Sequence, residues 1–511
     1  MTQGELERIP QPFVKHISEL EERIMEDVVR KIKANGFSSA SADWQITRLQ
    51  QLSESEEEIR KHIREALNAT EAELDKIFDD TVYHEYYGHD RAYRLTGMQQ
   101  IPFEKNQELQ QLIQAVRDQT SGAFQNMTAS MGFARMDSSG RLQYDILQQF
   151  YQGTLDAAIM DIQTGAFDYN TVLNRTIDAM TKSGVRWIDY SSGRRDRVDV
   201  AARRAVMTGF RQVQGWMNEQ VARELGTDSY EVTYHVGARP AHQPWQGRVW
   251  TYHELETVCG LGSITGLHGA NCYHDYNAFI PGVSARTYTD TQLDDMILEE
   301  NTPKEFNGKE YTTYEALQKQ RQMERAMRKS RQDIHLLQKG EGDADQITLK
   351  KAKYQGQMQT YKDFSKKMKL PEQMDRVYQD GLTERFGLSK VQKKALEEQQ
   401  KYDIIIKELR EAGVKGEIHY PPRDIDTSSL AFDDIHINNQ REHNVTEEEA
   451  RLFIQNAKVS VTVWNGKYER YYGIDGTVYV DLAEGLIRTA YKKEQYSTNV
   501  EAILEVIGRY G

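Results

Sequence analysis

The sequence predicts a mainly α protein with a long helical body, a small irregular α+β region in its middle, and an α+β domain at its C-terminus. Two observations support this prediction. Apolar residues recur at helical spacing through most of the first 412 residues, as between Val198 and Leu225. After residue 413 the pattern changes to short β-branched runs separated by Asn-Gly, Asp-Gly and Glu-Gly turns. Because 511 residues exceed what one hydrophobic core usually organises, we expect several domains.

Changes in composition indicate where the chain divides. A Gly-, Pro- and aromatic-rich stretch that contains both cysteines separates a helical region from a second, highly charged one. In the strand-rich tail, a helix capped by Thr446 and Glu449 precedes an expected four-stranded antiparallel sheet. The expected regions are an N-terminal helical docking region (1–185), a central core (186–290), a charged helical arm with a linker (291–412) and the α+β domain (413–511).

Composition excludes several classes of protein. A net charge of -13 argues against coating of duplex DNA, because phosphate neutralisation dominates that kind of binding. Two cysteines argue against a disulfide framework. No apolar run is long enough to span a membrane, and the N-terminal residues lack the order of a secretory signal. We therefore expect a protein that stays in the cytoplasm where it is made, without membrane contact.

The N-terminal region is predicted to be an array of helices with short connections, broken at Gly132, at 138–140 and at Gly165. Apolar spacing predicts a helix that ends at Gly36, and a capping box at Ser53 and Glu56 predicts the start of the next. The segment TVYHEYYGHDRAYR follows, with four tyrosines besides His84 and His89. It is interpreted as a packing surface against another subunit, because tyrosine combines apolar area with a polar tip. A metal site at the two histidines is the alternative.

The charged arm is predicted to be a helical hairpin. Residues 314–339 and 344–368 are rich in Gln, Lys, Arg and Glu, with few apolar positions, and a Gly-Glu-Gly-Asp turn separates them. This composition is typical of long surface helices or of a coiled-coil arm. A further helix at 390–412 is expected to link the arm to the tail.

The central region raises the question of a metal site. Its Cys and His side chains suit zinc, but the short Cys-x2–4-Cys spacing of most structural zinc sites is absent. The favoured interpretation is a packing role, with Cys272 as a small buried residue and the imidazoles holding turns, so no metal or other cofactor is expected. The zinc alternative involves His242, His268, Cys272 and His274, with Cys259 nearby.

Three ordered segments resemble a known family. They read DYSSGRR…DVAARRAVMTGFRQ, ARPAHQPWQGRVW and HGANCYH…FIPG. Together they resemble the phage minor capsid protein 2 family, relatives of the MuF-type head morphogenesis proteins of tailed bacteriophages, over roughly residues 1–370. The resemblance implies a structural role inside the phage head near the portal, in a few copies. The implied partners are the portal protein and the major capsid protein, with packaged DNA nearby.

A basic run lies at the start of the long helix that ends near Leu225. It admits two interpretations, which the sequence leaves open. One is a solvated face paired with neighbouring aspartates. The other is a patch that faces DNA or an acidic portal surface, since guanidinium groups bind phosphate and carboxylate alike. The residues proposed for that contact are Arg194, Arg195 and Arg197.

The tail resembles the phage-borne nuclease-like domains grouped with barnase, EndoU, the colicins and RelE. The likeness rests on DDIHINNQREHNVTEEEA, WNGKYERYYG, TVYVDL and IRTAYKKEQY. In such a domain the RNA is cut by its own 2′-hydroxyl, which requires proton transfer and cations on the phosphate. Histidine suits proton transfer near neutral pH. The candidates are His436 and His443 for proton transfer, Arg488, Thr489 and Lys492 for phosphate, and Tyr491 or Trp464 for base stacking.

Two observations argue against an active RNase. Acidic residues outnumber basic ones in 411–511, and His436 and His443 can also serve as turn residues before the helix at Thr446. The expected function is therefore virion assembly, inside the capsid and in the host cytoplasm during assembly, with RNA as a candidate substrate of the tail. The alternative is a bacterial polymorphic RNase toxin with a phage-derived delivery module.

Overall fold

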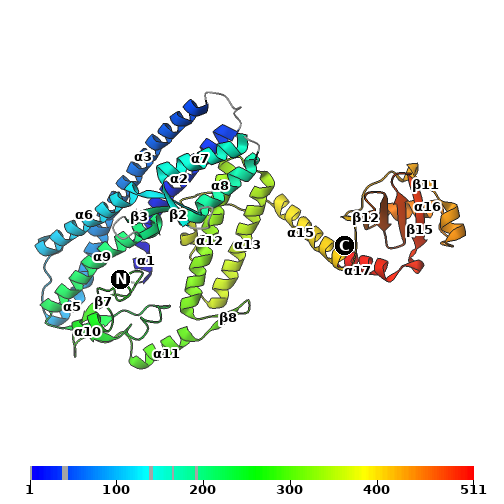
Figure 1. The fold of residues 1–511 in the computed structure, drawn as a ribbon. Coiled ribbons are helices and arrows are strands. Elements are labelled where there is room, and N and C mark those ends of the chain that lie inside the picture. The colour runs from blue at the N-terminus through cyan, green and yellow to red at the C-terminus, as the bar shows by residue number, and fades with distance from the viewer. Residues whose placement is uncertain (1–2, 37–43, 137–141, 164–165, 190–193, 511) are drawn as a thin grey trace. The chain divides into compact units, whose positions relative to one another are not determined.

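The computed structural model describes residues 3–36, 44–136, 142–163, 166–189 and 194–510 (Figure 1). The chain forms two compact units, residues 1–387 and 388–511. The first is built mainly from helices and the second around one sheet. The mainly α prediction with an α+β tail is confirmed. No helix among the described residues is long and apolar enough to cross a membrane.

The helices of the first unit come in long antiparallel pairs and short connecting turns. They are α1 (Gln3–Arg8), α2 (Gln11–Gly36), α3 (Trp44–Lys76), η1 (Ile77–Thr81), α4 (Val82–Gly88), α5 (Asp90–Thr96), η2 (Phe103–Lys105), α6 (Gln107–Ala129), α7 (Leu147–Gln163), α8 (Tyr169–Ser183), α9 (Val198–Glu224), α10 (Tyr252–Thr257), α11 (Asp290–Asn301), α12 (Thr313–Lys339), α13 (Ala344–Met368), α14 (Met374–Val377) and η3 (Tyr378–Asp380). Its strands are β1 (Met131–Met136), β2 (Leu142–Ile146), β3 (Val185–Asp189), β4 (Arg194–Arg197), β5 (Ser229–Val232), β6 (Val249–Thr251), β7 (Tyr276–Phe279), β8 (Lys304–Phe306) and β9 (Lys309–Tyr311).

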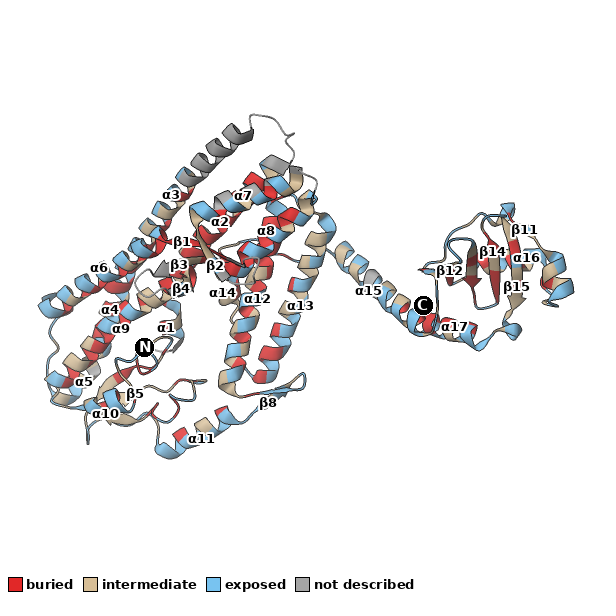
Figure 2. Cartoon of the chain, viewed as in Figure 1, coloured by how far each residue is buried: buried red, intermediate tan, exposed pale blue. Residues whose placement is uncertain are grey.

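The core of the first unit lies between α2, α6 and α9, whose inward faces are buried (Figure 2). Phe13 and Phe124 stack at 5.7 Å between ring centroids, so α2 and α6 meet through aromatic contact. Side chains of α6 pack directly on the α9 backbone at Gly209, because a Cβ there would lie 2.7 Å from Oγ1 of Thr120 and 2.8 Å from Cγ1 of Val116. The predicted core faces of α2 and α9 are confirmed.

An antiparallel sheet of order β2-β1-β3-β4 interrupts the helices. The helical prediction was therefore wrong at β1 and β2, although one predicted break, Gly132, falls in β1; the other two, at 138–140 and Gly165, lie outside the described residues. The long helix begins only at Val198. These strands are four to six residues long, too short to show a clear two-residue period. The capping-box prediction at Ser53 and Glu56 was also wrong, because α3 already begins at Trp44.

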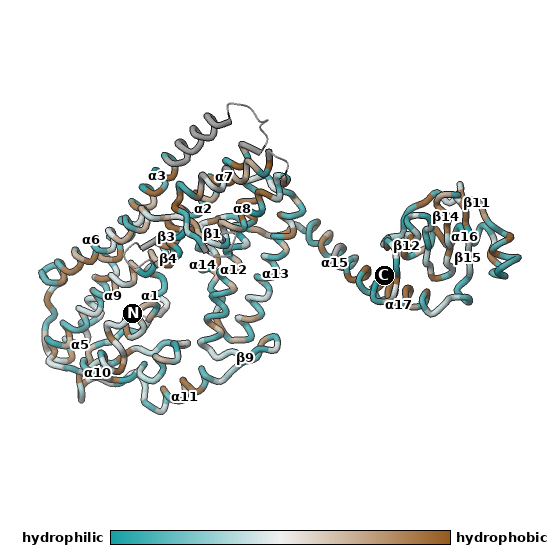
Figure 3. The backbone as a smooth tube through the Cα atoms, in the orientation of Figure 1, coloured by the Kyte–Doolittle hydropathy of each residue, from teal (hydrophilic) through white to brown (hydrophobic). Residues whose placement is uncertain are grey.

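The predicted surface arm is wrong in its burial, although its two helices are confirmed as α12 and α13. Figure 3 colours much of α12 and α13 as hydrophilic, yet α12 packs against α2 and α8 and buries many polar side chains. The Arg331 guanidinium is 1% exposed and donates to Asp380 Oδ2 at 2.6 Å. Carboxylates from other elements therefore take the place of water as partners of the charged side chains on this helix.

His335 in α12 lies between two carboxylates. Its Nε2 contacts Glu26 Oε1 at 2.5 Å and its Nδ1 contacts Glu384 Oε2 at 2.6 Å. Burial opposes protonation, but the hydrogen bonds to these carboxylates outweigh it and raise the pKa of His335 above its usual value. A raised folded-state pKa means that the protonated imidazole stabilises the folded unit.

We expect the first unit to lose stability as the pH rises. The contribution of His335 is fully present below its unfolded pKa of about 6.5 and is lost as the pH rises through its raised folded pKa. Burial raises the pKa of Glu22 well above its usual value. Glu22 therefore also lowers the stability of the folded unit as the pH rises. The check is chemical denaturation between about pH 6 and pH 9. His335→Gln should flatten this dependence, whereas the exposed His253→Gln should leave it unchanged.

The second unit is a six-stranded sheet of order β10-β12-β13-β14-β15-β11. The predicted antiparallel meander is confirmed as β12 to β15, with β10 added antiparallel at one edge and β11 added parallel to β15 at the other. The elements are α15 (Lys390–Glu411), β10 (Glu417–His419), η4 (Thr427–Ser429), β11 (Ala431–Phe432), η5 (Ile435–Gln440), α16 (Glu447–Gln455), β12 (Val459–Val463), β13 (Tyr468–Tyr472), β14 (Gly476–Asp481), β15 (Leu486–Lys492), η6 (Lys493–Gln495) and α17 (Thr498–Tyr510).

Helices cover both faces of this sheet. On one face α16 packs over β13, β14 and β15. On the other, α15 and α17 cover β10, β12 and β13, where Ile405 and Leu409 of α15 enter the core. Helix α15 was predicted to be a linker, but it lies within the second unit, and its C-terminal half contributes to the core. The structural boundary therefore lies between residues 387 and 388 rather than at 412.

Candidate functional site

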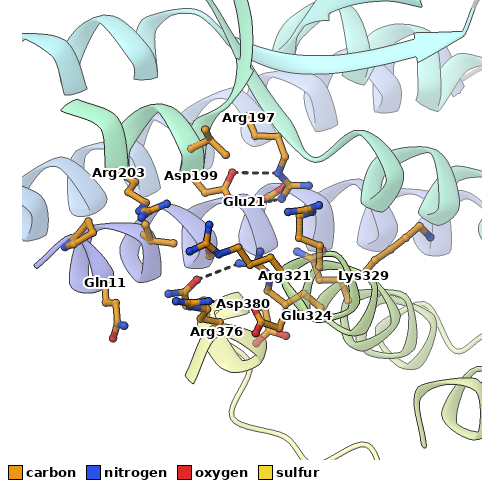
Figure 4. Close-up of a pocket in the computed structure, with 18 of the residues that line it drawn as sticks. Gln11, Glu21, Arg197, Asp199, Arg203, Arg321, Glu324, Lys329, Arg376 and Asp380 are labelled. Carbon is orange, nitrogen blue, oxygen red and sulfur yellow. Dashed lines mark hydrogen bonds and ion pairs between the residues drawn. The ribbon is translucent and has the colours of Figure 1, made fainter. Parts of the chain in front are cut away.

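A charged cavity of about 220 Å³ lies in the first unit (Figure 4). Side chains from α2, α9, α12 and the α14–η3 segment point into it, and basic residues outnumber acidic ones. An anionic group would therefore meet a complementary charge there. The basic residues in its lining are Arg197, Arg203, Arg321, Arg325, Arg328, Lys329 and Arg376, and the acidic ones are Glu7, Glu21, Asp199, Glu324 and Asp380.

Ion pairs occupy much of this cavity wall. Arg197 lies 3.2 Å from Glu21 and 3.1 Å from Asp199. Burial raises the pKa of Glu21, and the charge of Arg197 partly offsets that effect. Arg376 contacts Glu7 at 2.6 Å. Burial lowers the pKa of Arg328, whose guanidinium donates to Gln379 at 3.2 Å.

The three arginines of the predicted basic run lie in different surroundings. Arg197 is held by Glu21 and Asp199, so the paired interpretation describes it. Arg195 is exposed, and its guanidinium lies 5.8 Å from the ring centroid of Tyr144. The side chain of Arg194 falls outside the described residues. Of the three, Arg195 is therefore the residue that the described structure leaves at the surface.

The tyrosine-rich segment packs inside its own chain. Tyr86 donates to the Ile101 carbonyl at 2.7 Å, and its ring meets Phe103 edge to face at 5.5 Å. Tyr86 and Tyr93 are buried, whereas Tyr87 is exposed, and the expected contact with another subunit stays a prediction. Burial lowers the pKa of His89, and no group of three metal-ligating atoms in the described residues includes His84 or His89.

The central region brings three of the four zinc candidates together. Nδ1 of His242 and Nδ1 of His274 are 3.4 Å apart, and Cys272 Sγ is 3.5 Å from the second and 3.9 Å from the first. The fourth candidate, His268, points elsewhere and contacts Asp275 Oδ1 at 3.0 Å. The three converging side chains are 2–6% exposed.

The protonation of this cluster follows from its burial. Burial lowers the pKa of His242 and lowers that of His274 well below its usual value, so both imidazoles are neutral. Burial raises the pKa of the Cys272 thiol. The packing interpretation is thus correct about the burial of Cys272. It does not account for two imidazole nitrogens and a sulfur that meet at one point.

The second unit has an uncovered patch on one sheet face, which we call the β14–β15 patch. The core beneath α15 and α17 ends at Tyr472. The neighbouring strands β14 and β15 carry three half-buried residues on this face, Tyr479, Thr489 and Tyr491. The strand register places them on the same face as Tyr472. His443 lies against Tyr491, with 5.5 Å between ring centroids. The patch therefore combines aromatic rings with an imidazole.

The predicted catalytic residues lie either in β15 or next to it, at different points along the strand. His443 Nδ1 contacts Gln495 at 3.0 Å near the end of the strand. The His436 ring contacts Gln440 at 3.0 Å, and its backbone N–H donates to Asp433, which also accepts from Arg488 at 3.0 Å. No contact among the described residues joins the two histidines.

The remaining candidates occupy separate places. Lys492 pairs with Glu449 of α16 at 2.7 Å. Trp464 is 74% exposed in the β12–β13 turn, and the register places that turn beside the Leu486 end of β15. Tyr491 is near the opposite end, so the predicted stacking residues Tyr491 and Trp464 do not share a site.

Sequence analysis missed one polar cluster in this unit. Glu469 is fully buried in β13 and accepts hydrogen bonds from the hydroxyls of Ser460 and Thr462, both at 2.5 Å. His419 and Arg423 each come within 3.9 Å of its carboxylate. The sequence signal for this cluster was an acidic residue in the middle of a predicted strand, since a buried carboxylate needs polar partners.

The family was tested by comparison with known proteins. The model of phage minor capsid protein 2 matches residues 1–364, about seven tenths of the chain. The chain belongs to this family. No curated protein and no solved structure matches it.

Family membership implies a virion location for this minor capsid protein. The match covers the Cys/His cluster and most of the cavity lining, and it ends inside α13 of the first unit, before the lining residues Arg376, Gln379 and Asp380. The second unit lies wholly outside the match. The family therefore describes the first unit, and any function of the second must be argued from its own residues.

Proposed function

We propose that this minor capsid protein is an internal head protein of a tailed bacteriophage, positioned near the portal, that carries a metal-independent ribonuclease as its second unit. The observation that supports the first part is the family match, which covers nearly all of the first unit and none of the second. The portal protein and the major capsid protein are its proposed partners. The second unit has its own hydrophobic cores, so it can fold as a separate domain that the first unit carries.

The ribonuclease proposal rests on the β14–β15 patch. Tyr479 and Tyr491 offer rings on which a base can stack, and Arg470 lies 4.8 Å above the Tyr479 ring. His443 stands beside Tyr491, where it can take the proton of a 2′-hydroxyl as that oxygen attacks the phosphorus. The 5′-oxygen then leaves and receives a proton, so this cleavage requires no external reactant.

Cations near the patch are held loosely enough to exchange partners. Arg488 and Lys492 are paired with Asp433 and Glu449, and both pairs are partly exposed. Because exposed ion pairs contribute only about 0–1 kcal/mol, a phosphate can displace either carboxylate at small cost. The register of β14 and β15 shifts at Arg488, so this residue has no paired residue on β14. We assign His443 the main proton-transfer role and Lys492 a phosphate contact, made from the end of β15 where it pairs with Glu449 of α16.

We expect the first unit alone to direct the protein into particles. A chain truncated after residue 387 should be incorporated at the wild-type level, because the truncation removes no residue of the first unit's core. Quantitative mass spectrometry of purified, nuclease-treated particles measures this. Removing residues 1–130 would be a poor test, since it deletes α2 and α6 from that core.

The matched control is residues 388–511 expressed alone, which should be absent from particles. Truncated chains missing from particles while the 388–511 fragment enters them would place the docking surface in the second unit. A full chain that never enters particles but still harms cells would favour the rival toxin function.

A further inference from the structure

The cluster of His242, Cys272 and His274 has the dimensions of a zinc site. Zinc binds nitrogen at about 2.0–2.1 Å and sulfur at about 2.3 Å, so neighbouring ligand atoms of a tetrahedral site lie about 3.3–3.6 Å apart. Two of the three distances in the cluster, 3.4 and 3.5 Å, fall in this range, and the third is 3.9 Å. The three atoms thus form one face of a tetrahedron.

Hydrogen bonds at the far side of each ring determine which nitrogen carries the proton. Nε2 of His242 lies 2.8 Å from the carbonyl oxygen of Thr265, which can only accept, so Nε2 donates and Nδ1 keeps its lone pair. Nε2 of His274 lies 2.9 Å from Gln246 Oε1. That oxygen also accepts from the backbone N–H of His235 at 3.1 Å, which identifies it as the amide oxygen. Nδ1 of His274 is therefore also bare.

Two bare nitrogens facing each other at 3.4 Å in a buried site require a positive group between them. No hydrogen bond can join them, because neither carries a proton. An imidazolium would place an unpaired charge in this site, where both rings are buried. The Cys272 thiol has one proton and can satisfy only one of the two. A metal cation satisfies both nitrogens and the sulfur at once.

The surroundings of the three side chains support metal binding. The backbone carbonyl of Thr265 and the side chain of Gln246 orient the ligand rings, as outer partners do around zinc. Trp245 lies against both rings, with centroids 4.4 and 4.8 Å away. The ligands come from two stretches with little regular structure, the turns at 237–247 and the loop at 259–275. A shared cation would join them.

We propose that this minor capsid protein binds one zinc ion through Nδ1 of His242, Sγ of Cys272 and Nδ1 of His274. A water molecule completes the tetrahedron. The ion cross-links the two loops of the central region, and binding releases the Cys272 proton. His268 is not a ligand, because its Nε2 is engaged by Asp275.

The test is the metal content of the full chain, purified without chelators and measured by plasma mass spectrometry. We expect about one zinc ion per chain in the wild type and near-complete loss in Cys272→Ser and His274→Gln. Two matched controls should keep the metal. Cys259→Ser alters the other buried thiol of the same core, and His268→Gln alters the neighbouring imidazole.

A second measurement does not depend on whether the ligand variants fold. Wild-type chain stripped of zinc and loaded with cobalt should show the visible bands of a tetrahedral thiolate site, and Gln246→Leu should weaken cobalt or zinc affinity about 10- to 100-fold without removing the bands. Wild-type chain that holds no zinc and gives no such bands overturns the proposal. Equal zinc loss from Cys259→Ser and Cys272→Ser would also overturn it, because the loss would then follow from a disturbed core.

Discussion

Residues 388–511, expressed alone, are expected to cut RNA in the presence of EDTA, and His443→Ala is expected to lower the rate about 10²- to 10⁴-fold. The fragment should fold, because both of its hydrophobic cores use residues of this unit only. It must begin before α15, since Ile405 and Leu409 belong to one of those cores. Cleavage needs no metal, because the 2′-hydroxyl is the nucleophile and side chains supply proton transfer. The measurement is the cleavage rate of a labelled single-stranded RNA.

His419→Gln is the matched control for this experiment. His419 is a second half-buried histidine of the same unit, next to Glu469 and Thr462 rather than the β14–β15 patch. It should keep most of the rate, and Lys492→Ala should lose part of it. A fragment that is folded by circular dichroism yet inert on RNA would end the ribonuclease proposal. Loss of cleavage in His419→Gln but not in His443→Ala would move the site to the Glu469 cluster.

The strand-rich tail was predictable because its signals are local. Asn465 and Gly466 lie in the β12–β13 connection (464–467) and have positive φ angles of 53° and 87°, which these two residue types adopt readily. The capping box of Thr446 and Glu449 is present as predicted. The edge strands β10 and β11 were not predictable, because they are three and two residues long and carry no alternating pattern.

The burial of α12 could not be predicted from its composition. A charged helix is solvated unless other elements supply partners, and here those partners are remote in sequence. His335 meets Glu26 across 309 positions and Asp333 accepts from Thr181 across 152. Local periodicity does not encode such pairs, so the hydrophilic pattern of α12 predicted the wrong environment.

The central cluster was half predictable for a related reason. Cys272 and His274 are two residues apart in an extended segment, where such side chains share one side. Their third partner, His242, lies 30 positions before Cys272 in a turn, so zinc-finger spacing does not apply. His268 fits the same sequence pattern but turns away, with a φ of 59° that places its ring on Asp275. Only the fold separates the ligand from its neighbour.

Arg331→Met is expected to destabilise the first unit by about 3–5 kcal/mol, because it leaves Asp380 buried without its counter-charge. The guanidinium is 1% exposed, and it also donates to the carbonyl oxygens of Glu384 (3.2 Å) and Leu382 (2.7 Å). All of these groups lose their donor together. The measurement is urea denaturation of the full chain, followed through the transition of the first unit.

The exposed Arg325→Met in the same helix is the matched control and should change stability by no more than about 0.5 kcal/mol. The double variant Arg331→Met, Asp380→Asn should recover part of the loss, because a neutral amide costs less to bury than an unpaired carboxylate. If Arg331→Met costs no more than Arg325→Met, the pair is dispensable. If the double variant is instead less stable than Arg331→Met, Asp380 stabilises the unit through the Leu382 N–H, to which it is hydrogen-bonded at 3.1 Å, rather than through Arg331.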